Sequence, residues 1–402
     1  MSTDFDVLVV GAGIQGAGAA EVLATNHYSV VILEQLGIAA ATSSRSSKLI
    51  HGGLRYLESG QFRLVYECLR ERKWLLDNKP ELVRMVPFYI PIYQHSKRPA
   101  WLVRLGLSLY SLLSGINNSD SRFRKVPKSQ WDSLPGLNRE GLKAVFRYYD
   151  AQTDDAALTR DVVASAVAQG AQIICPGSLV GAEVTRDHVR VDYVANGKLN
   201  TLRTRALVNC SGPWVANTNA RCTPPVDIPP IDLVAGTHIL LPLSLGDKIY
   251  YVEADDGRAI FVMPWQDKTL VGTTERPYFG DPRDVTPTLE EESYLLQAVQ
   301  KYFAQARGLN GEDICESYAG LRVLPEMEKS PFARSRESII CCDDDKKPRM
   351  LAVAGGKLTS YRATARKILK KLEPTLQAGR SIATKNTPTK TEDSSSERER
   401  NI

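Results

Sequence analysis

Short apolar runs alternate with segments that suit helices along this chain. The runs Asp6–Val10 and Val30–Leu33 lack the polar alternation of a half-exposed strand, so we predict strands buried on both faces. Between them, the small residues of Ala17–Ala24 favour a helix. Strand, helix and strand in this order indicate a parallel sheet covered by helices, which is an α/β architecture.

The rest of the chain extends this pattern. Apolar positions at helical spacing predict three long helices, over residues 61–77, 155–170 and 289–306. Four short strands within residues 236–272 predict an antiparallel meander above a pocket. Three further strands are expected to return to the first sheet, at 206–210, 317–325 and 350–354.

We therefore predict two domains in a discontinuous arrangement. The parallel-sheet domain takes residues 1–87, 152–232 and 318–374, and the antiparallel-sheet domain takes residues 88–151 and 233–317. Residues 375–402 are rich in Ser, Thr, Lys and Glu and hold almost no apolar residue, which predicts a disordered polar tail.

A glycine motif follows the first strand directly. Gly11 permits a tight turn, Gly13 lets backbone approach a pyrophosphate, and Gly16 allows close packing of helix on strand. The helix N-terminus supplies free N–H groups for phosphates. Glu34 ends the second strand about 20 residues on, where a carboxylate accepts hydrogen bonds from a ribose. This spacing predicts a dinucleotide-binding unit.

The segment after Glu34 indicates which dinucleotide is bound. Residues 40–58 are dense in hydroxyl groups and contain the pair Gly52-Gly53. The run Ser46–Leu57 (SSKLIHGGLRYL) resembles the signature of the flavin-dependent glycerol-3-phosphate dehydrogenases, quinone-coupled members of the amino-acid-oxidase-like flavoproteins. The resemblance extends over about residues 5–373 and implies FAD as cofactor. Asp154 and Asp155 depart from the family pattern, at a place that we expect to lie outside the site.

The motif and the resemblance together assign FAD contacts to the glycine turn after the first strand, to Glu34 and to the loop 42–51. They also assign contacts to the glycine turns at 211–214 and 356–359. The assigned residues are Gly11, Gly13, Gly16, Glu34, Thr42, Ser43, Ser44, Ser46, Lys48, Leu49, His51, Ser211, Gly212, Trp214, Gly356, Lys357, Leu358 and Thr359.

Three cations follow glycines in separate parts of the chain: Arg55, Arg322 and Lys357. A dianionic phosphate suits Arg forks combined with a Lys point charge, so we predict that they bind the substrate phosphate. The resemblance implies the same role for these positions. The alternative for each cation taken singly is a surface or salt-bridged side chain.

Alcohol oxidation also needs a base for the hydroxyl proton, and a neutral imidazole suits this task. His51 lies inside the flavin loop and is the first candidate, with a structural role as the alternative. His238, in the meander, is the second candidate, and Arg322 is expected to lower the pKa of the substrate hydroxyl by its charge.

Composition limits the partners. The chain of 402 residues has a net charge of +5, which fits an anionic ligand or an anionic membrane surface, and no nucleic-acid partner is expected. Its seven cysteines show no metal-ligand spacing, so we expect no metal site. We expect no signal peptide before the first strand, and no apolar run reaches the length of a membrane span.

One segment nevertheless favours a membrane surface. Pro99–Leu113 is apolar nearly all round, with Trp101 near its start and Lys97, Arg98 and Arg104 as cations. It is either a buried helix or a helix lying in a bilayer interface. On the second interpretation, we expect a cytoplasmic protein attached peripherally to the inner face of the cytoplasmic membrane.

The function predicted from the sequence is FAD-dependent oxidation of sn-glycerol 3-phosphate to dihydroxyacetone phosphate, with electrons passed to a membrane quinone. Two alternatives stay open: oxidation of a 2-hydroxy acid or amine on the same fold, and a truncated flavoprotein without catalysis. Whether the chain forms a homodimer also stays open.

Overall fold

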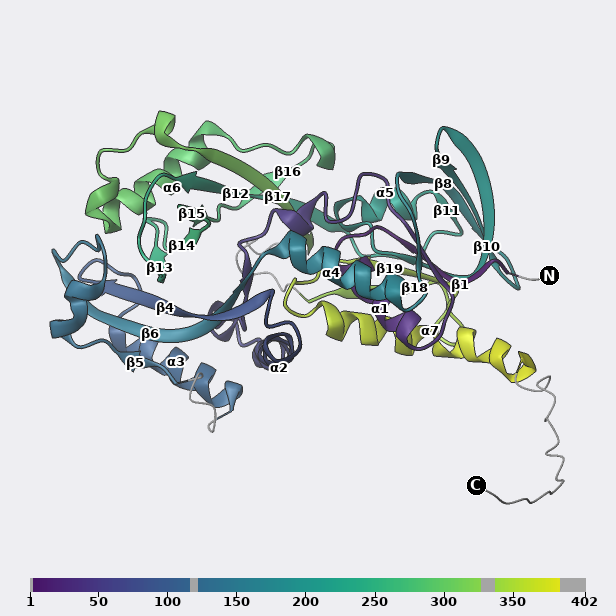
Figure 1. Cartoon of the computed structure of the whole chain (residues 1–402), viewed down its shortest axis with the longest axis horizontal. Coiled ribbons are helices and arrows are strands. Elements are labelled where there is room, and N and C mark those ends of the chain that lie inside the picture. Colours follow the sequence, from purple (N-terminus) through teal and green to yellow (C-terminus); the bar gives the residue numbers. More distant parts are fainter. Residues whose placement is uncertain (1–2, 116–121, 327–336, 384–402) are drawn as a thin grey trace, which may run out of the picture.

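The computed structural model describes residues 3–115, 122–326 and 337–383. Two sheets dominate it (Figure 1). One, with its helices, contains the N-terminus and α7, and the other forms the opposite half of the elongated molecule. No helix within the described ranges is long and apolar enough to cross a membrane.

The first sheet has nine strands, and β1 (Phe5–Val10) lies between β10 (Lys198–Asn209) and β2 (Val30–Leu33). All three run parallel, with Val7, Leu8 and Val9 fully buried. The remaining strands are β7 (Gln172–Ile174), β8 (Gly177–Val184), β9 (Val189–Ala195), β11 (Cys222–Thr223), β18 (Ile339–Cys342) and β19 (Met350–Ala354). The predicted parallel pairing of the buried strands beside β1 is confirmed, in a sheet that also contains antiparallel pairs.

Three helices pack together on this sheet: α1 (Ile14–Thr25), α4 (Asp155–Ala168) and α7 (Tyr361–Ala383). Their apolar side chains share one core with β1 and β2. Gly18 allows α1 and α7 to approach closely, because a Cβ there would lie 2.5 Å from the Tyr361 ring. This packing fixes the N-terminus of α1 over the sheet edge. The short helix α5 (Val215–Asn219) follows β10.

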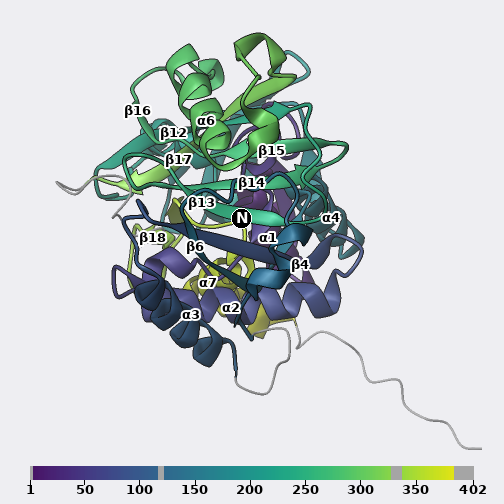
Figure 2. The same cartoon turned by 90° about the vertical axis from the view of Figure 1, so that its left-hand side faces the viewer.

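The second sheet has ten strands. They are β3 (Leu49–Ile50), β4 (Val83–Tyr93), β5 (Arg124–Lys125), β6 (Leu142–Thr153), β12 (Ile231–Leu241), β13 (Ile249–Glu253), β14 (Ala259–Trp265), β15 (Lys268–Gly272), β16 (Arg276–Tyr278) and β17 (Glu316–Pro325). The four predicted antiparallel strands are present: β13, β14 and β15 form a meander, and β12 pairs with β15 instead of β13. Helix α6 (Leu289–Tyr302) lies on one side, and α2 (Phe62–Asn78) and α3 (Ala100–Ser114) lie on the other (Figure 2).

One strand prediction is wrong. β17 does not return to the first sheet; it pairs antiparallel with β12 along ten residues, because both strands bury apolar side chains in the second sheet. The strand predicted at 206–210 does return to the first sheet, as the second half of the longer strand β10, which pairs with β9 by its first half and with β1 by its second. The two-domain division itself stays a prediction.

The start of the predicted polar tail is also wrong. Helix α7 continues through Pro374 to Ala383, although an interior proline costs about 3 kcal/mol. Leu372 and Leu376, on either side of it, are fully buried, and Arg205 donates hydrogen bonds to the carbonyls of Thr375 and Leu376. Burial of these two leucines therefore outweighs the loss of the helix hydrogen bond that Pro374 cannot donate. Residues 384–402 lie outside the described ranges.

Candidate active site

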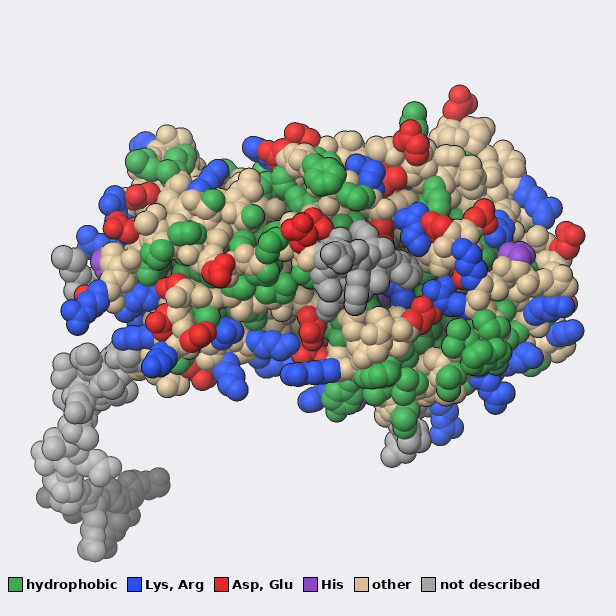
Figure 3. All heavy atoms as spheres, turned by 180° about the vertical axis from the view of Figure 1, so that it is seen from behind, with side chains coloured by type: hydrophobic (Ala, Val, Ile, Leu, Met, Phe, Trp, Pro, Cys, Tyr) green, Lys and Arg blue, Asp and Glu red, His purple; other side chains and the backbone are tan. Residues whose placement is uncertain are grey.

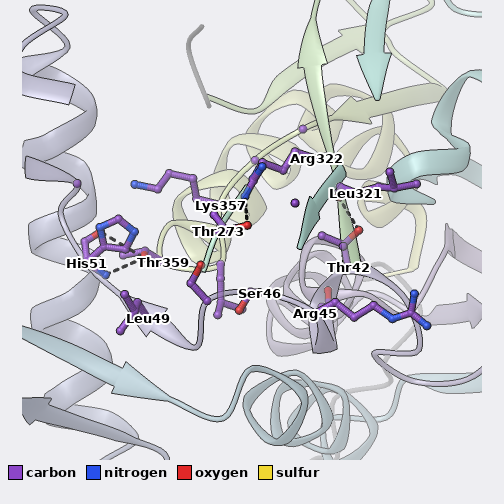
Figure 4. A pocket seen from close by; sticks show the side chains of 18 of the residues that line it. Thr42, Arg45, Ser46, Leu49, His51, Thr273, Leu321, Arg322, Lys357 and Thr359 are labelled. Atoms are coloured by element: carbon purple, nitrogen blue, oxygen red, sulfur yellow. Dashed lines mark hydrogen bonds between the residues drawn. The ribbon is translucent and has the colours of Figure 1, made fainter. Parts of the chain in front are cut away.

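A cavity of about 290 Å³ is lined by residues of both sheets and of the loops beside them (Figure 4). It brings together most of the predicted site residues from six separate parts of the chain. These are Gly13, Thr42, Ser43, Ser46, Leu49, His51, Arg55, Gly212, His238, Arg322, Gly356, Lys357, Leu358 and Thr359. The other predicted residues, Gly11, Gly16, Glu34, Ser44, Lys48, Ser211 and Trp214, are not among its lining residues.

The glycine turn after β1 has room for backbone only. Gly11 has a φ of +102°, and a Cβ on Gly16 would lie 1.9 Å from the Gly11 carbonyl oxygen. Gly13, Ile14 and Gln15 therefore reach the cavity with the N-terminus of α1. This end carries backbone N–H groups and partial positive charge, which suit a pyrophosphate.

Glu34 is buried at the end of β2 and organises the same turn. Its carboxylate accepts hydrogen bonds from the backbone N–H groups of Ala12 (2.7 Å), Leu36 (2.7 Å) and Gly37 (3.2 Å). A carboxylate offers about four lone-pair sites. The geometry therefore gives Glu34 a role in the turn itself, and the ribose contact stays a prediction.

The hydroxyl-rich loop, residues 40–58, is held in place mostly by hydrogen bonds of its own side chains. Thr42 donates a hydrogen bond to the Leu321 carbonyl on β17 (2.8 Å), and the Ser43 hydroxyl accepts one from the Ile14 N–H at the start of α1 (2.9 Å). The Lys48 ammonium group is buried and donates to the Ser44 carbonyl at 2.6 Å and to Asp155 at 2.5 Å. The Lys48 side chain is thus occupied inside the protein.

Asp155 lies outside the cavity lining, as expected from the sequence, but it supports the loop that forms part of this lining. Besides pairing with Lys48, its buried carboxylate accepts the Ser46 N–H at 2.9 Å, so it anchors the loop that lines the cavity. Asp154 caps α4 by accepting the Ala157 N–H. An aspartate before a helix predicts a cap such as that of Asp154, but Lys48, the partner of Asp155, lies 107 residues earlier in the chain, where no local pattern points to it.

Two of the three predicted phosphate cations meet at one aromatic ring. The Lys357 ammonium group lies 4.4 Å from the centre of the Tyr56 ring and 3.3 Å from the Cys68 sulfur, and the Arg55 guanidinium group lies 5.8 Å from the same ring. Gly355 and Gly356, both with positive φ, bring Lys357 to this point. The two cations, Arg55 and Lys357, thus come from distant segments of the chain and lie near the same ring.

Arg322 lies on β17 and is held by the turn after β15. It donates to the Thr273 hydroxyl (3.0 Å) and the Thr274 carbonyl (3.2 Å), and the Glu275 carboxylate lies 3.9 Å away. Figure 4 shows Arg322 directed toward Thr273. Since Arg322, Arg55 and Lys357 line one cavity, the sequence prediction of a shared anion site is compatible with the fold.

Both candidate bases line the cavity. The His51 backbone N–H donates to the Thr359 hydroxyl (3.2 Å), and its ring lies edge-on to Phe261. The His238 ring is buried, stacks on Tyr318 with centroids 5.0 Å apart, and places Nε2 2.9 Å from the Ser47 hydroxyl. Burial, reinforced by the charges of Arg322 and Lys48, lowers the pKa of His238 well below 6.5, so this imidazole is neutral at pH 7. Ser47 was not predicted, although it lies in the signature run.

These features fit FAD. The glycine turn offers backbone N–H groups at a helix N-terminus, and a side chain at Gly356 would lie 2.6 Å from Gln15, so this backbone also stays bare toward the cavity. Gln15 Oε1 is buried without a partner among the described residues. We found no cluster of His, Cys, Asp and Glu suited to a metal ion in the described ranges.

Alanine at Gly16 is expected to remove FAD from the purified protein almost completely, because its Cβ would force the turn away from the helix N-terminus. The ratio of flavin to protein absorbance measures this. Gly308→Ala is the matched control, since a Cβ at Gly308 meets no atom within 4 Å. FAD retention at the wild-type level in the Gly16 variant would refute the assigned turn.

Comparisons with known proteins agree with this site. Residues 6–362 match the family of FAD dependent oxidoreductases (DAO). The glycerol-3-phosphate dehydrogenase of Pseudomonas aeruginosa is 39% identical over 378 residues, which cover 92% of this chain and 72% of that protein. The D-erythritol 1-phosphate dehydrogenase of Brucella abortus is 36% identical, covering 92% of this chain and 73% of that protein.

A solved structure extends the agreement to three dimensions. The glycerol-3-phosphate dehydrogenase of Bacillus halodurans, complexed with FAD, superposes with a TM-score of 0.72 at 26% identity, covering 93% of this chain and 65% of that one. The chain therefore belongs to the FAD-dependent oxidoreductase family, in the group of the aerobic glycerol-3-phosphate dehydrogenases, and its cofactor is FAD.

Proposed function

We propose that this protein oxidises sn-glycerol 3-phosphate to dihydroxyacetone phosphate and passes the electrons to a membrane quinone. One observation carries the proposal: the three predicted cations and two imidazoles, from separate segments, line the cavity that the dinucleotide-binding turn also reaches. A small phosphorylated alcohol needs this combination, because its phosphate requires positive charge and its hydroxyl proton requires a base.

In this proposal the three cations bind the phosphate and the imidazoles handle the hydroxyl proton. Arg55 and Lys357, which meet at Tyr56, bind the phosphate dianion, and Arg322 supplies the third cation and lowers the pKa of the hydroxyl. His51 takes the hydroxyl proton at a ring nitrogen; His238, with Ser47 beside it, is the second candidate for this step. FAD, when bound, supplies the acceptor for the hydride that leaves the carbon. The cavity walls keep water from the reacting carbon.

An apolar groove beside the site supports a lipophilic electron acceptor. It measures about 180 Å³ and lies between α3 and β4, lined on the helix side by Leu102, Leu105 and Leu109. Leu54, Arg55 and Tyr251 line both this groove and the cavity of the active site. A quinone ring that enters from an apolar surface would therefore come close to the flavin.

The geometry of α3 favours the membrane-surface interpretation. Its inner face, with Val103, Leu107 and Tyr110, is buried, whereas Trp101 is 68% and Leu105 60% exposed. An exposed apolar patch on a helix marks an interaction surface. We infer peripheral attachment to the inner face of the cytoplasmic membrane; a homodimer stays a further possibility for the assembly.

Replacing Trp101 and Leu105 together by Asp is expected to move the protein from the membrane pellet to the supernatant, because two charges cannot enter the bilayer interface. Dye-linked activity should be kept, since both side chains are exposed and neither lines the active-site cavity. Leu36→Asp with Leu199→Asp is the matched control on exposed sites outside α3. Unchanged sedimentation with vesicles would exclude α3 as the anchor.

Similarity to the Brucella enzyme makes a longer polyol phosphate the second candidate substrate. Steady-state turnover with a dye acceptor separates the two. We expect a higher kcat/KM for glycerol 3-phosphate than for D-erythritol 1-phosphate, and added quinone in vesicles should replace the dye. A preference for the four-carbon substrate would overturn the substrate assignment, and a preference for lactate or an amino acid would overturn the phosphate site.

A further inference from the structure

A buried polar chain connects the active-site loop to helix α3. The Gly52 N–H, next to His51, donates to the Tyr110 hydroxyl at 2.8 Å, and this hydroxyl donates to the Asp150 carboxylate at 2.6 Å. Arg72 of α2 forms an ion pair with the same carboxylate and donates to the Tyr149 carbonyl at 3.1 Å. Four separate segments thus meet behind the loop.

The contact at Gly52 leaves no room for a side chain at this position. A Cβ at residue 52 would lie 2.5 Å from the Tyr110 hydroxyl oxygen and 2.7 Å from Leu69, so the loop backbone rests directly on the tyrosine. Tyr110 is 3% exposed, and its ring meets Tyr148 edge-on. A buried N–H that loses its acceptor is costly, which ties the loop to this one position.

The ion pair in turn fixes the hydroxyl. Asp150 and Arg72 are both buried, so neither charge has water as an alternative partner. Burial raises the pKa of Asp150, while Arg72 and the Tyr110 hydroxyl act in the opposite direction. With one carboxylate oxygen on Arg72 and the other on Tyr110, the hydroxyl has a single favourable orientation, and its lone pair faces Gly52.

We propose that Tyr110, held by Asp150 and Arg72, is a positioning residue of the reaction: its hydroxyl group fixes Gly52 and thereby places the His51 ring at the cavity. This inference rests on the proposed function, in which His51 handles the hydroxyl proton. Tyr110 is not among the residues that line the cavity, so in this proposal it acts only through the loop.

A double-mutant cycle tests the proposal on the FAD-loaded protein, with the rate of anaerobic flavin reduction as readout. Tyr110→Phe is expected to lower the limiting rate about 10-fold. In the double variant with His51→Ala, the rate should match that of His51→Ala alone within about twofold, because Tyr110 acts through a ring that is no longer there. Losses that multiply would overturn the proposal.

Two further measurements separate positioning from general stability. Hydrogen–deuterium exchange of the segment 46–57 should be faster in Tyr110→Phe, whatever the substrate. Tyr302→Phe also removes a buried tyrosine hydroxyl, one that donates to the Glu253 carbonyl, and should lower Tm without changing exchange in this segment or the reduction rate. Unchanged exchange in Tyr110→Phe would refute the contact.

If Tyr110→Phe does not fold, Asp150→Asn takes its place, since the amide keeps an acceptor for the hydroxyl but loses the charge facing Arg72. It should give a smaller loss that is again non-additive with His51→Ala, and full additivity would refute the proposal. If glycerol 3-phosphate fails to reduce the wild-type flavin, the proposed substrate is wrong; the exchange experiment still decides the role of Tyr110.

Discussion

His51→Ala is expected to lower kcat by about 10²- to 10⁴-fold, the range typical of losing a general base. The loss should appear both with glycerol 3-phosphate and with unphosphorylated glycerol, because the same hydroxyl proton has to leave in each case. The KM for glycerol 3-phosphate should change little, since the phosphate cations stay in place. Rates of flavin reduction measured by stopped-flow absorbance give the comparison directly.

Two further variants, His95→Ala and His238→Ala, test whether the loss is specific to His51. His95→Ala removes an exposed ring outside the cavity and should leave kcat unchanged. If His51→Ala keeps near-normal activity and His238→Ala loses it, His238 is the base. The acid limb of the kcat/KM profile would then lie well below pH 6.5, because burial and two neighbouring cations lower the pKa of His238.

Arg322→Ala or Lys357→Ala is expected to lower kcat/KM for glycerol 3-phosphate by about 10- to 150-fold, since a charge-assisted hydrogen bond to a dianion contributes roughly 1.5–3 kcal/mol. Unphosphorylated glycerol, a very poor substrate, should be affected far less, because it has no phosphate to lose. Lys301→Ala, at a surface ion pair with Asp255, is the control for loss of positive charge. Equal losses on both substrates would contradict the phosphate site and favour a 2-hydroxy acid.

Local rules identified the nucleotide-binding unit from sequence because each step depends on neighbours in the chain. Gly11, Gly13 and Gly16 are dictated by a turn of a few residues, and the apolar runs beside them specify buried parallel strands. The signature run similarly placed His51 and Arg55 in the cavity lining. In such segments, pattern and structure agree.

Long-range pairing was harder to predict. β17 is as apolar as a strand of the first sheet, and only its pairing with β12 decides where it lies. Glu34 and Lys48 were assigned to the cofactor by their position in the sequence. The Glu34 carboxylate, however, accepts backbone N–H groups, and the Lys48 ammonium group pairs with Asp155; no local pattern reveals these partners. The helix was likewise predicted to end at Pro374, but α7 continues beyond it, because burial of Leu372 and Leu376 outweighs the low helix propensity of proline.

The most direct test of the account is anaerobic mixing of the purified yellow protein with a panel of alcohols, followed at the flavin absorbance band. The panel contains glycerol 3-phosphate, D-erythritol 1-phosphate, glycerol, lactate and an amino acid. The account predicts rapid and complete bleaching by glycerol 3-phosphate, with little or none by glycerol, lactate or the amino acid. Bleaching by lactate or the amino acid, with none by glycerol 3-phosphate, would contradict it.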